Sequence, residues 1–366
     1  MGQSAAGHVA GFAVPSVQLL TPDGQRQTHP EFQYGGETTA ITELFRQMVL
    51  IRRIDTEGFA LQRKGELALW PPVLGQEAAQ VGSTAALRPT DFVYGTYRET
   101  SVGWLRGIDI ADLVAVWRGS SLGGWDAPRF GFAPMSIVIG SQPLHAVGHA
   151  LGLTLRGDIG DAVLTYFGDG AASQGDVMEA LEFAVLQQAP VVFFCQNNQY
   201  AISMPVDHQT AVPIVRKAEG FGLPAVRVDG NDVLACQAVT AWALDHARAG
   251  GGPVFVEALT YRMGPHTTSD DPTRYRDAAE LDEWRARDPI DRVRRHLESV
   301  GVGSETFDAI DAEAERLGEA VRTSCLAIPD PDLADWFDNV YAEQTDELRA
   351  QKAEYIAWRS QYGGAA

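Results

Sequence analysis

The sequence predicts an α/β protein built on a doubly wound parallel sheet, in which helices cover both faces of the sheet. Two short apolar runs, residues 162–167 and 191–195, are typical of strands that are buried on both faces. Between them, apolar residues recur at helical spacing, and these are Val177, Leu181, Ala184 and Val185. Two further apolar runs, residues 225–228 and 254–259, flank a helical pattern over residues 232–249. This alternation of strands and helices is the observation that predicts the fold class.

The chain is expected to have three parts. Residues 1–37 are rich in Gly, Pro, Gln and Thr with little apolar periodicity, and we expect an extended arm that lies on a partner. An α/β domain is predicted over residues 38–280, and it begins with a helix that Thr38 or Thr39 can cap. The remaining residues, 281–366, are charged with helical spacing and are predicted to form a C-terminal helical appendage.

The composition indicates where the protein is located and which classes of partner it has. The 366 residues carry a net charge of -19, which argues against nucleic-acid binding because phosphate backbones are bound by clustered Lys and Arg. Three scattered cysteines, with no apolar run of about 18 residues, indicate neither a disulfide framework nor a membrane span. The first basic residue is Arg26, so a secretory or transit leader is not expected. We therefore expect a cytoplasmic protein whose partners are small molecules and other proteins.

Unusual polar residues follow two of the predicted strands. Gly168-Asp169-Gly170 comes after the first, and Gln196-Asn197-Asn198 comes after the second. Glycines let the backbone approach an anion closely, and the helix that follows offers free N–H groups to a phosphate. The Asp169 carboxylate and the Asn198 amide oxygen are the hard ligands that Mg²⁺ prefers, and the Tyr200 backbone carbonyl is a third candidate.

The spacing of the two motifs carries more information than either motif alone. By itself, Gly-Asp-Gly is typical of a tight turn, and Asn-Asn is typical of a loop at a strand end. Here 26 residues separate Gly170 from Asn197, and they predict one helix and one strand. Both motifs then lie at neighbouring strand ends, where open parallel sheets bind ligands. No Gly-x-Gly-x-x-Gly follows an early strand, so a dinucleotide-binding site is not predicted.

This spacing resembles the signature of thiamine-diphosphate-dependent enzymes. The segments 166–173 and 193–203 resemble the α subunit of the first component of 2-oxo acid dehydrogenase complexes. Further similarities are the Tyr-Arg element at residues 95–99 and the active-site loop formed by Tyr261, Arg262, His266, Ser269, Asp270 and Asp271. Residues 336–341 are similar to the branched-chain members, so the resemblance extends from about residue 40 to the end. It implies the thiamine-diphosphate-binding fold, in its diphosphate-binding half.

The resemblance also implies roles for individual residues. The implied cofactor-binding residues are Tyr97, Arg98, Ile137, Ile139, Gly168, Asp169, Gly170, Ala171, Asn198 and His266. The implied Mg²⁺ ligands are Asp169, Asn198 and Tyr200. His266 is also the implied catalytic residue, which contacts the diphosphate and assists proton transfer during acylation of a lipoyl group.

Two departures from the family pattern bear on the cofactors. Ser136, Ser141 and Gln142 fall where branched-chain relatives bind a structural K⁺, but residues 137–140 differ from the run found in those relatives. This run is partly similar to pyruvate dehydrogenases. Gln196 stands where some relatives have a basic residue, so one contact to the diphosphate is expected to be weaker or absent.

The family activity needs a glutamate beside the aminopyrimidine ring, and complete thiamine enzymes carry it on a second α/β domain. One such domain is evident here, so the resemblance implies a separate β subunit and an α2β2 assembly. It implies decarboxylation of a branched-chain 2-oxo acid and acyl transfer to a lipoyl-bearing dihydrolipoyl acyltransferase. Two alternatives remain: an α subunit for pyruvate or acetoin, and a non-catalytic module that holds Mg²⁺ and a diphosphate.

Overall fold

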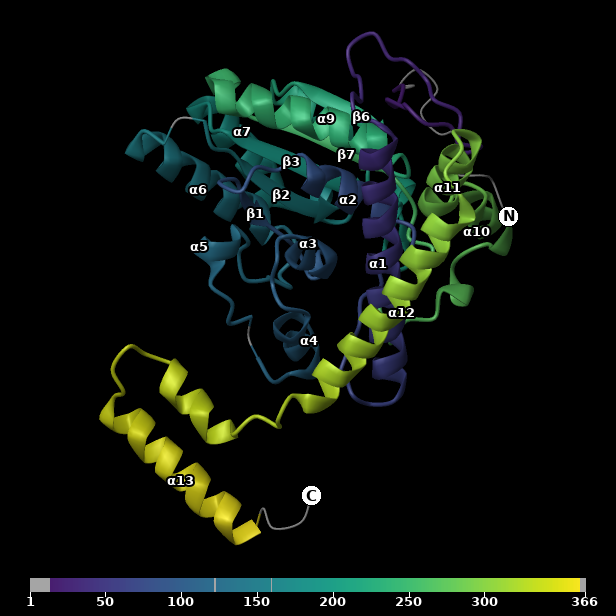
Figure 1. Ribbon diagram of the computed structural model, residues 1–366. Coiled ribbons are helices and arrows are strands. Elements are labelled where there is room, and N and C mark those ends of the chain that lie inside the picture. Colours follow the sequence, from purple (N-terminus) through teal and green to yellow (C-terminus); the bar gives the residue numbers. More distant parts are fainter. Residues whose placement is uncertain (1–13, 122, 159, 363–366) are drawn as a thin grey trace.

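The computed structural model describes residues 14–121, 123–158 and 160–362. At its centre is a five-stranded sheet in which all neighbours are parallel, in the order β1-β2-β3-β7-β6 (Figure 1). The strands are β1 (Phe92–Tyr94), β2 (Val163–Gly168), β3 (Val191–Asn197), β6 (Ala225–Asp229) and β7 (Val254–Leu259), with a separate antiparallel pair β4 (Tyr200–Ala201) and β5 (Met204–Pro205). The predicted parallel sheet is confirmed, and all four predicted strands are present. β1 was not predicted.

Two hydrophobic cores lie on opposite faces of the sheet. Successive side chains of a strand alternate between faces, so Leu164 and Val192 join one core while Val163 and Val191 join the other. Helices α1, α2 and α9 contribute to the first core, and α6, α7 and α8 contribute to the second. Since both faces are covered, β2 and β3 are almost continuously apolar, as the sequence suggested.

The helices of the α/β part are α1 (Thr38–Arg63), α2 (Glu77–Ala85), α3 (Thr100–Leu105), α4 (Ile110–Arg118), α5 (Ala127–Phe130), α6 (Ser141–Arg156), α7 (Gly175–Gln187), α8 (Ile214–Gly220) and α9 (Val233–His246). Short helical turns are η1 (Ala171–Ser173), η2 (Val206–His208), η4 (Pro272–Arg274) and the π-type turn η3 (Ala247–Gly251). Within the described ranges, none of these or the later helices combines the length and apolar character needed to span a bilayer.

The N-terminal arm packs on its own chain over the residues that are described. Val17 pairs with the edge of β6, and the backbone amides of Leu19 and Leu20 both donate to Asp232 Oδ2 at 2.6 Å. Residues 14–37 have little regular secondary structure and lie against this sheet and α9, because their apolar side chains complete the first core. The expected contact of the arm with a partner chain stays a prediction. Residues 1–13 lie outside the described part.

Helix α1 begins at Thr38, close to the predicted start. The residue before it, Glu37, occupies the cap position and makes no side-chain hydrogen bond to the helix. The predicted threonine cap is therefore wrong, since Thr38 already has a place in the first turn.

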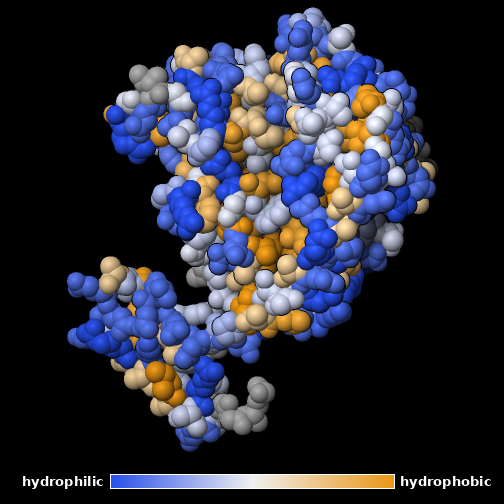
Figure 2. Space-filling model, viewed as in Figure 1, coloured by the Kyte–Doolittle hydropathy of each residue, from blue (hydrophilic) through white to orange (hydrophobic). Residues whose placement is uncertain are grey.

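The C-terminal part is helical, as predicted, but it has two different environments. Its helices are α10 (Ala278–Arg285), α11 (Pro289–Ser299), α12 (Ser304–Ala327), η5 (Leu333–Asn339) and α13 (Asp346–Tyr362). Val293 and Phe307, on α11 and α12, belong to the same core as α1, so these two helices are part of the main body. Within the described part of the chain, the C-terminal hairpin, residues 333–362, stands away from it (Figure 1). Figure 2 shows apolar side chains on the surface of this hairpin. Its exposed aromatic residues include Trp336 and Trp358.

A buried ion pair connects the start of β1 to the end of α9. Asp91 and Arg248 have side chains that are 0% and 5% exposed, and Asp91 also accepts bonds from the amides of Arg88 and Ala162. We expect Asp91→Ala to destabilise the protein by about 3–5 kcal/mol, because it removes the buried partner of the Arg248 guanidinium and leaves only the exposed Asp245 to pair with it. Urea unfolding would measure the loss. Asp245 pairs with the same arginine but is 62% exposed, so Asp245→Ala is expected to cost only about 0–1 kcal/mol. Equal effects of the two changes would contradict this account.

Candidate functional site

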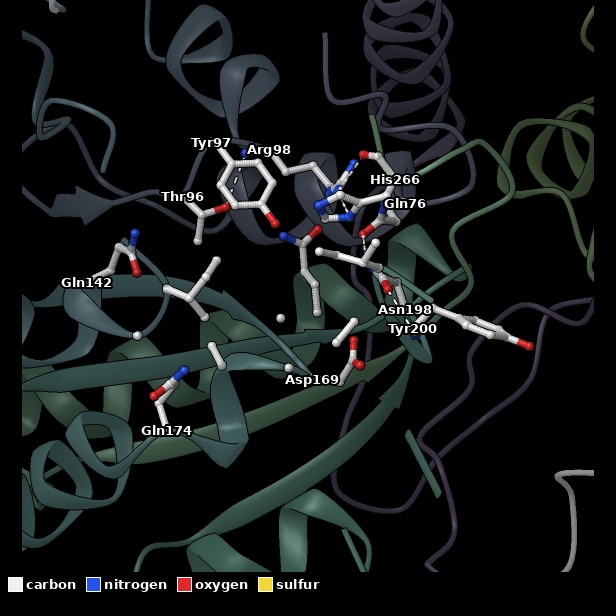
Figure 3. Close-up of a pocket in the computed structure, with 18 of the residues that line it drawn as sticks. Gln76, Thr96, Tyr97, Arg98, Gln142, Asp169, Gln174, Asn198, Tyr200 and His266 are labelled. Carbon is white, nitrogen blue, oxygen red and sulfur yellow. Dashed lines mark hydrogen bonds between the residues drawn. The ribbon is translucent and has the colours of Figure 1, made fainter. Parts of the chain in front are cut away.

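A cavity of about 280 Å³ opens at the carboxyl ends of β2 and β3 (Figure 3). The residues predicted to bind cofactor or metal that line it are Tyr97, Arg98, Ile139, Gly168, Asp169, Gly170, Ala171, Asn198, Tyr200 and His266. Figure 3 shows Asp169 on one side of the cavity, with Arg98 and His266 on the opposite side. Segments far apart in the sequence therefore meet at one edge of the sheet, as expected for parallel strands.

Asp169 and Gly170 form the turn between β2 and the short helix η1. The Asp169 side chain is almost fully buried, and its Oδ2 accepts one hydrogen bond from Gln209 Nε2 at 3.2 Å. Burial raises the pKa of Asp169 to about 6. Gly170 is required for space, since a Cβ there would lie 2.7 Å from the Cβ of Ala201. The glycine thus allows the β4 segment to close over the turn that carries the carboxylate.

The two neighbouring asparagines have different environments. Asn198 Nδ2 donates to Gln76 Oε1 at 3.1 Å, and its own Oδ1 accepts from the Tyr200 amide at 3.3 Å (Figure 3). Asn197 instead donates to Glu257 on β7 at 2.7 Å. Gln76 therefore fixes the Asn198 amide in the cavity wall, whereas Asn197 ties the end of β3 to the next strand.

The backbone carbonyl of Tyr200 is its candidate metal-binding group, and its side chain points away from the cavity. The Tyr200 hydroxyl donates to Glu280 at 2.8 Å, and Figure 3 shows the ring directed outward. Its backbone carbonyl accepts a hydrogen bond from Arg262 at 3.0 Å. A carbonyl oxygen has two lone pairs, so a second one is available for a metal ion.

Arg98 is held rigidly in the cavity wall. It is 6% exposed, and its guanidinium donates to the Pro72 carbonyl at 2.6 Å and to the His266 carbonyl at 3.1 Å. The guanidinium also lies 5.5 Å from the Tyr97 ring centre. Because these contacts fix the fork, the charge is in place before any anion arrives.

His266 lies between two guanidiniums. Nitrogens of Arg98 and Arg262 each lie 3.3 Å from His266 Nδ1. Because arginine only donates, Nδ1 must be the acceptor and Nε2 must carry the proton. Burial and the two cations lower the pKa of His266 to about 3, so the ring is neutral near pH 7. Asp270 accepts from the His266 amide at 2.7 Å and holds the loop.

The loop before α6 forms the outer rim of the cavity. Ile139 lines the cavity and is 43% exposed, whereas Ile137 is 64% exposed and does not reach it. Just inside the loop, Ser136 Oγ and Ser141 Oγ lie 3.0 Å apart, and Gln142 Nε2 donates to the Ser136 carbonyl at 2.7 Å. The buried Gln142 Oε1 has no partner among the described residues.

Sequence reasoning missed several side chains that line the cavity. Gln76 and Gln209 are single glutamines far from any motif, and nothing in their sequence context marks them. Glu99 and Gln196 lie in recognised motifs, but their contact with each other depends on the fold. A glutamine is common on any surface, so only the three-dimensional arrangement distinguishes these residues.

The fold and the cavity define an α/β protein of the class that binds phosphorylated ligands at the carboxyl ends of parallel strands. The dehydrogenase E1 component family model matches residues 45–324. The chain is 46% identical over 354 residues to the 3-methyl-2-oxobutanoate dehydrogenase subunit alpha of Mycobacterium tuberculosis, covering 96% of both chains.

Two other relatives are named for pyruvate. The chain is 38% identical over 319 residues to the pyruvate dehydrogenase E1 component subunit alpha of Bacillus cereus, which is 86% of this chain and 85% of the relative. It is 38% identical over 347 residues to the corresponding subunit of Staphylococcus epidermidis, which is 93% of this chain and 92% of the relative. The chain belongs to the dehydrogenase E1 component family, which implies dependence on thiamine diphosphate. The resemblance seen in the motifs is confirmed, and the chain is a component of an enzyme.

Proposed function

We propose that this chain is the α subunit of a thiamine-diphosphate-dependent enzyme that decarboxylates branched-chain 2-oxo acids. The observation that carries the substrate class is the 46% identity, over 96% of both chains, to a 3-methyl-2-oxobutanoate dehydrogenase subunit alpha. The relatives named for pyruvate are 38% identical. The similarity of residues 336–341 to branched-chain members supports the same choice.

The cavity suits Mg²⁺ and a diphosphate. Asp169 is buried with a single side-chain hydrogen bond and no cation in contact among the described residues, an arrangement that a bound Mg²⁺ would complete. We assign as its ligands the Asp169 carboxylate, the Asn198 amide oxygen and the Tyr200 carbonyl. Tyr97, Arg98, His266 and the backbone of residues 168–171 would hold the diphosphate, while Ile137 and Ile139 would offer backbone groups to the aminopyrimidine.

The protein's part in the reaction is to position and to supply protons. Bound thiamine diphosphate supplies the carbanion chemistry by which carbon dioxide leaves and the acyl group passes to lipoyllysine. Arg98, fixed by two backbone carbonyls, orients the anionic end of the cofactor. His266, neutral and protonated at Nε2, would donate a hydrogen bond into the cavity and assist proton transfer to the thiolate that leaves when the lipoyl disulfide opens.

A second chain would complete the site. The loop residues Ile137, Val138 and Ile139 and the neighbouring Ile202 and Met204 are 43–68% exposed, although all five are large and apolar. Such a group beside a cavity is typical of a protein interface. We infer that a β subunit covers it in an α2β2 assembly, and that a lipoyl-bearing acyltransferase receives the acyl group. The C-terminal hairpin offers a further apolar surface for the assembly.

A structural K⁺ is part of the proposal. Its ligands would be Ser136, Ser141, the Val138 carbonyl and Gln142 Oε1, and the last of these is a buried acceptor that lacks a partner among the described residues. We expect KCl, compared with NaCl at equal ionic strength, to raise Tm by a few degrees in a thermal scan. Gln142→Leu should remove the difference, whereas Gln174→Leu, at another glutamine lining the cavity, should keep it. An identical Tm in both salts would contradict the K⁺ site.

The substrate is tested with the chain co-expressed with its proposed β chain, in the presence of Mg²⁺ and thiamine diphosphate. We expect kcat/KM for 2-oxoisovalerate to exceed that for pyruvate by at least about tenfold, since each methylene bound in an apolar pocket contributes about 1–3 kcal/mol. A preference for pyruvate would contradict the proposed substrate class but would leave the proposed cofactor site unchanged. Turnover of acetoin, measured with the same pair of chains, tests the alternative that this chain is the α subunit of an acetoin dehydrogenase.

A further inference from the structure

Glu99 is a buried carboxylate in the wall of the cavity. It is 1% exposed and lies directly before α3. Its Oε2 accepts bonds from the Thr96 amide at 2.6 Å and the Thr96 hydroxyl at 2.5 Å. Its Oε1 accepts from Gln80 Nε2 at 3.3 Å and from Gln196 Nε2. All four donors are uncharged, so this carboxylate is desolvated without a cation in hydrogen-bond contact.

Gln196 joins Glu99 to the tip of β3. Its Nε2 contacts the carboxylate, while its buried Oε1 has no partner among the described residues. Both residues line the same cavity as Asp169 and Arg98. The orientation of the amide follows from charge, because an ionised carboxylate is an acceptor only and requires the NH₂ end of the amide.

This orientation is the wrong one for an anionic ligand. With Glu99 ionised, Gln196 holds its NH₂ end against Glu99, so one of its two N–H groups is committed there and its carbonyl oxygen is the end of the amide that has no partner among the described residues. An ionised diphosphate presents only acceptor oxygens, so the diphosphate and the Gln196 carbonyl oxygen would repel each other. If Glu99 carries a proton, it donates to the Gln196 carbonyl, and the amide can turn its NH₂ group toward the ligand.

We propose that binding of a diphosphate in this cavity is coupled to uptake of one proton by Glu99, through reversal of the Gln196 amide. The inference rests on the proposed function only in taking the diphosphate of the cofactor as the ligand. Glu99 is thus a positioning residue, which acts on the ligand through Gln196.

The charges around Glu99 agree with this direction. Burial raises the pKa of Glu99, and the nearby Arg98 opposes the rise. Arg98 is also the cation that would engage the diphosphate, so binding would weaken its effect on Glu99 and bring negative charge nearer. Tyr166 on β2 also faces Glu99, and burial raises the pKa of its phenol, so it is neutral at physiological pH. Since the pKa of Glu99 is then higher in the bound state, affinity for the diphosphate rises as pH falls through the bound-state pKa.

The experiment is titration calorimetry of thiamine diphosphate with Mg²⁺ into the assembled, cofactor-free α and β chains. The buffers are matched in pH but differ in ionisation enthalpy, which gives the number of protons taken up. We expect Glu99→Gln to reduce the uptake by up to one proton relative to the wild type. Because the introduced amide imitates a neutral carboxyl group, it should retain cofactor affinity and flatten the dependence of Kd on pH. An infrared difference spectrum should show a carboxylic acid C=O band on binding in the wild type only.

Matched variants separate this coupling from other sources of protons. The control variant Asp55→Asn changes another buried carboxyl group. Asp55 Oδ1 accepts hydrogen bonds from Trp70 Nε1 and from the Val73 amide, and an asparagine side-chain oxygen can accept both. Asp55 does not line the cavity, so the Asp55→Asn variant should take up as many protons on cofactor binding as the wild type. Gln196→Arg supplies permanent donors and a cation to Glu99, so it should bind with less proton uptake than the wild type.

The outcomes distinguish the two proposals. Equal uptake in the wild type and in Glu99→Gln would overturn the coupling and would leave His266 or the cofactor itself as the proton acceptor. Loss of affinity in Glu99→Gln at every pH would also overturn it, because the residue would then serve only to hold the Tyr97-Arg98 turn. Failure of the wild-type assembly to bind thiamine diphosphate would instead defeat the proposed function.

Discussion

Replacing Asp169 by alanine is expected to reduce turnover of 2-oxo acids by at least about a thousandfold, because a metal ion at a diphosphate site contributes several kcal/mol. Asp169 is the one carboxylate among the proposed Mg²⁺ ligands, and it is 2% exposed at the end of β2. The remaining proposed ligands, Asn198 and Tyr200, are neutral oxygens. Without the carboxylate, the diphosphate would meet Arg98 and His266 without a metal ion to bridge it to β2.

Two measurements separate loss of the metal from loss of the fold. Cofactor affinity, followed by tryptophan fluorescence, should fall together with turnover, while circular dichroism should be unchanged. The matched control is Asp176→Ala, which removes an exposed aspartate in the first turn of α7. It should behave as the wild type does. Substantial turnover by Asp169→Ala with normal Mg²⁺ dependence would show that the metal binds elsewhere.

The chain purified without a β chain is expected to turn over 2-oxo acids at least about a hundredfold more slowly than the co-expressed pair. One missing acid–base group is enough for such a loss. Asp169 and His266 lie on opposite sides of the cavity, and the exposed apolar residues beside it are those of the 137–139 loop together with Ile202 and Met204. A site of this kind is incomplete until another surface covers the rim.

The contact itself can be tested by a single charge. Val138 is 68% exposed in the rim, so Val138→Asp should weaken association with the β chain in analytical ultracentrifugation. Val300, 49% exposed after α11 and outside the cavity and its rim, provides the control Val300→Asp. Full activity of the lone chain, or equal association of both variants, would contradict the shared-site model.

The sequence predicted those elements whose pattern lies in their own residues, and it did not predict those that depend on contacts with distant segments. The runs at β2 and β3 are strong signals because both faces of these strands are buried, so nearly every residue is apolar. β1 has three residues and only Val93 is fully buried, which leaves no pattern to detect. The arm is rich in polar residues, and the contacts of Val17 with β6 depend on residues more than 200 positions away.

The candidate site follows the same rule. Asp169, Asn198 and His266 belong to motifs with defined spacing, and the fold brings them to one cavity. The difference between Asn197 and Asn198 could not be predicted, because it depends on Glu257 and Gln76 in other segments. The pairing of Glu99 with Gln196 is likewise a tertiary contact between two recognised motifs.

The irregular segments beside β1 and β6 have a consequence for the behaviour of the whole sheet. Val17 exchanges two backbone hydrogen bonds of 2.9 Å with β6, and Val93 of β1 bonds in the same way to Gly131 and Ala133 at 2.8 and 2.9 Å. Each outer strand thus has part of its free N–H and C=O groups occupied by a short stretch that is too irregular to be extended by another strand. Open edges are the usual route by which sheets of separate molecules join and aggregate. A chain that must present large apolar surfaces to its proper partners is thereby protected against pairing with its own copies through the sheet.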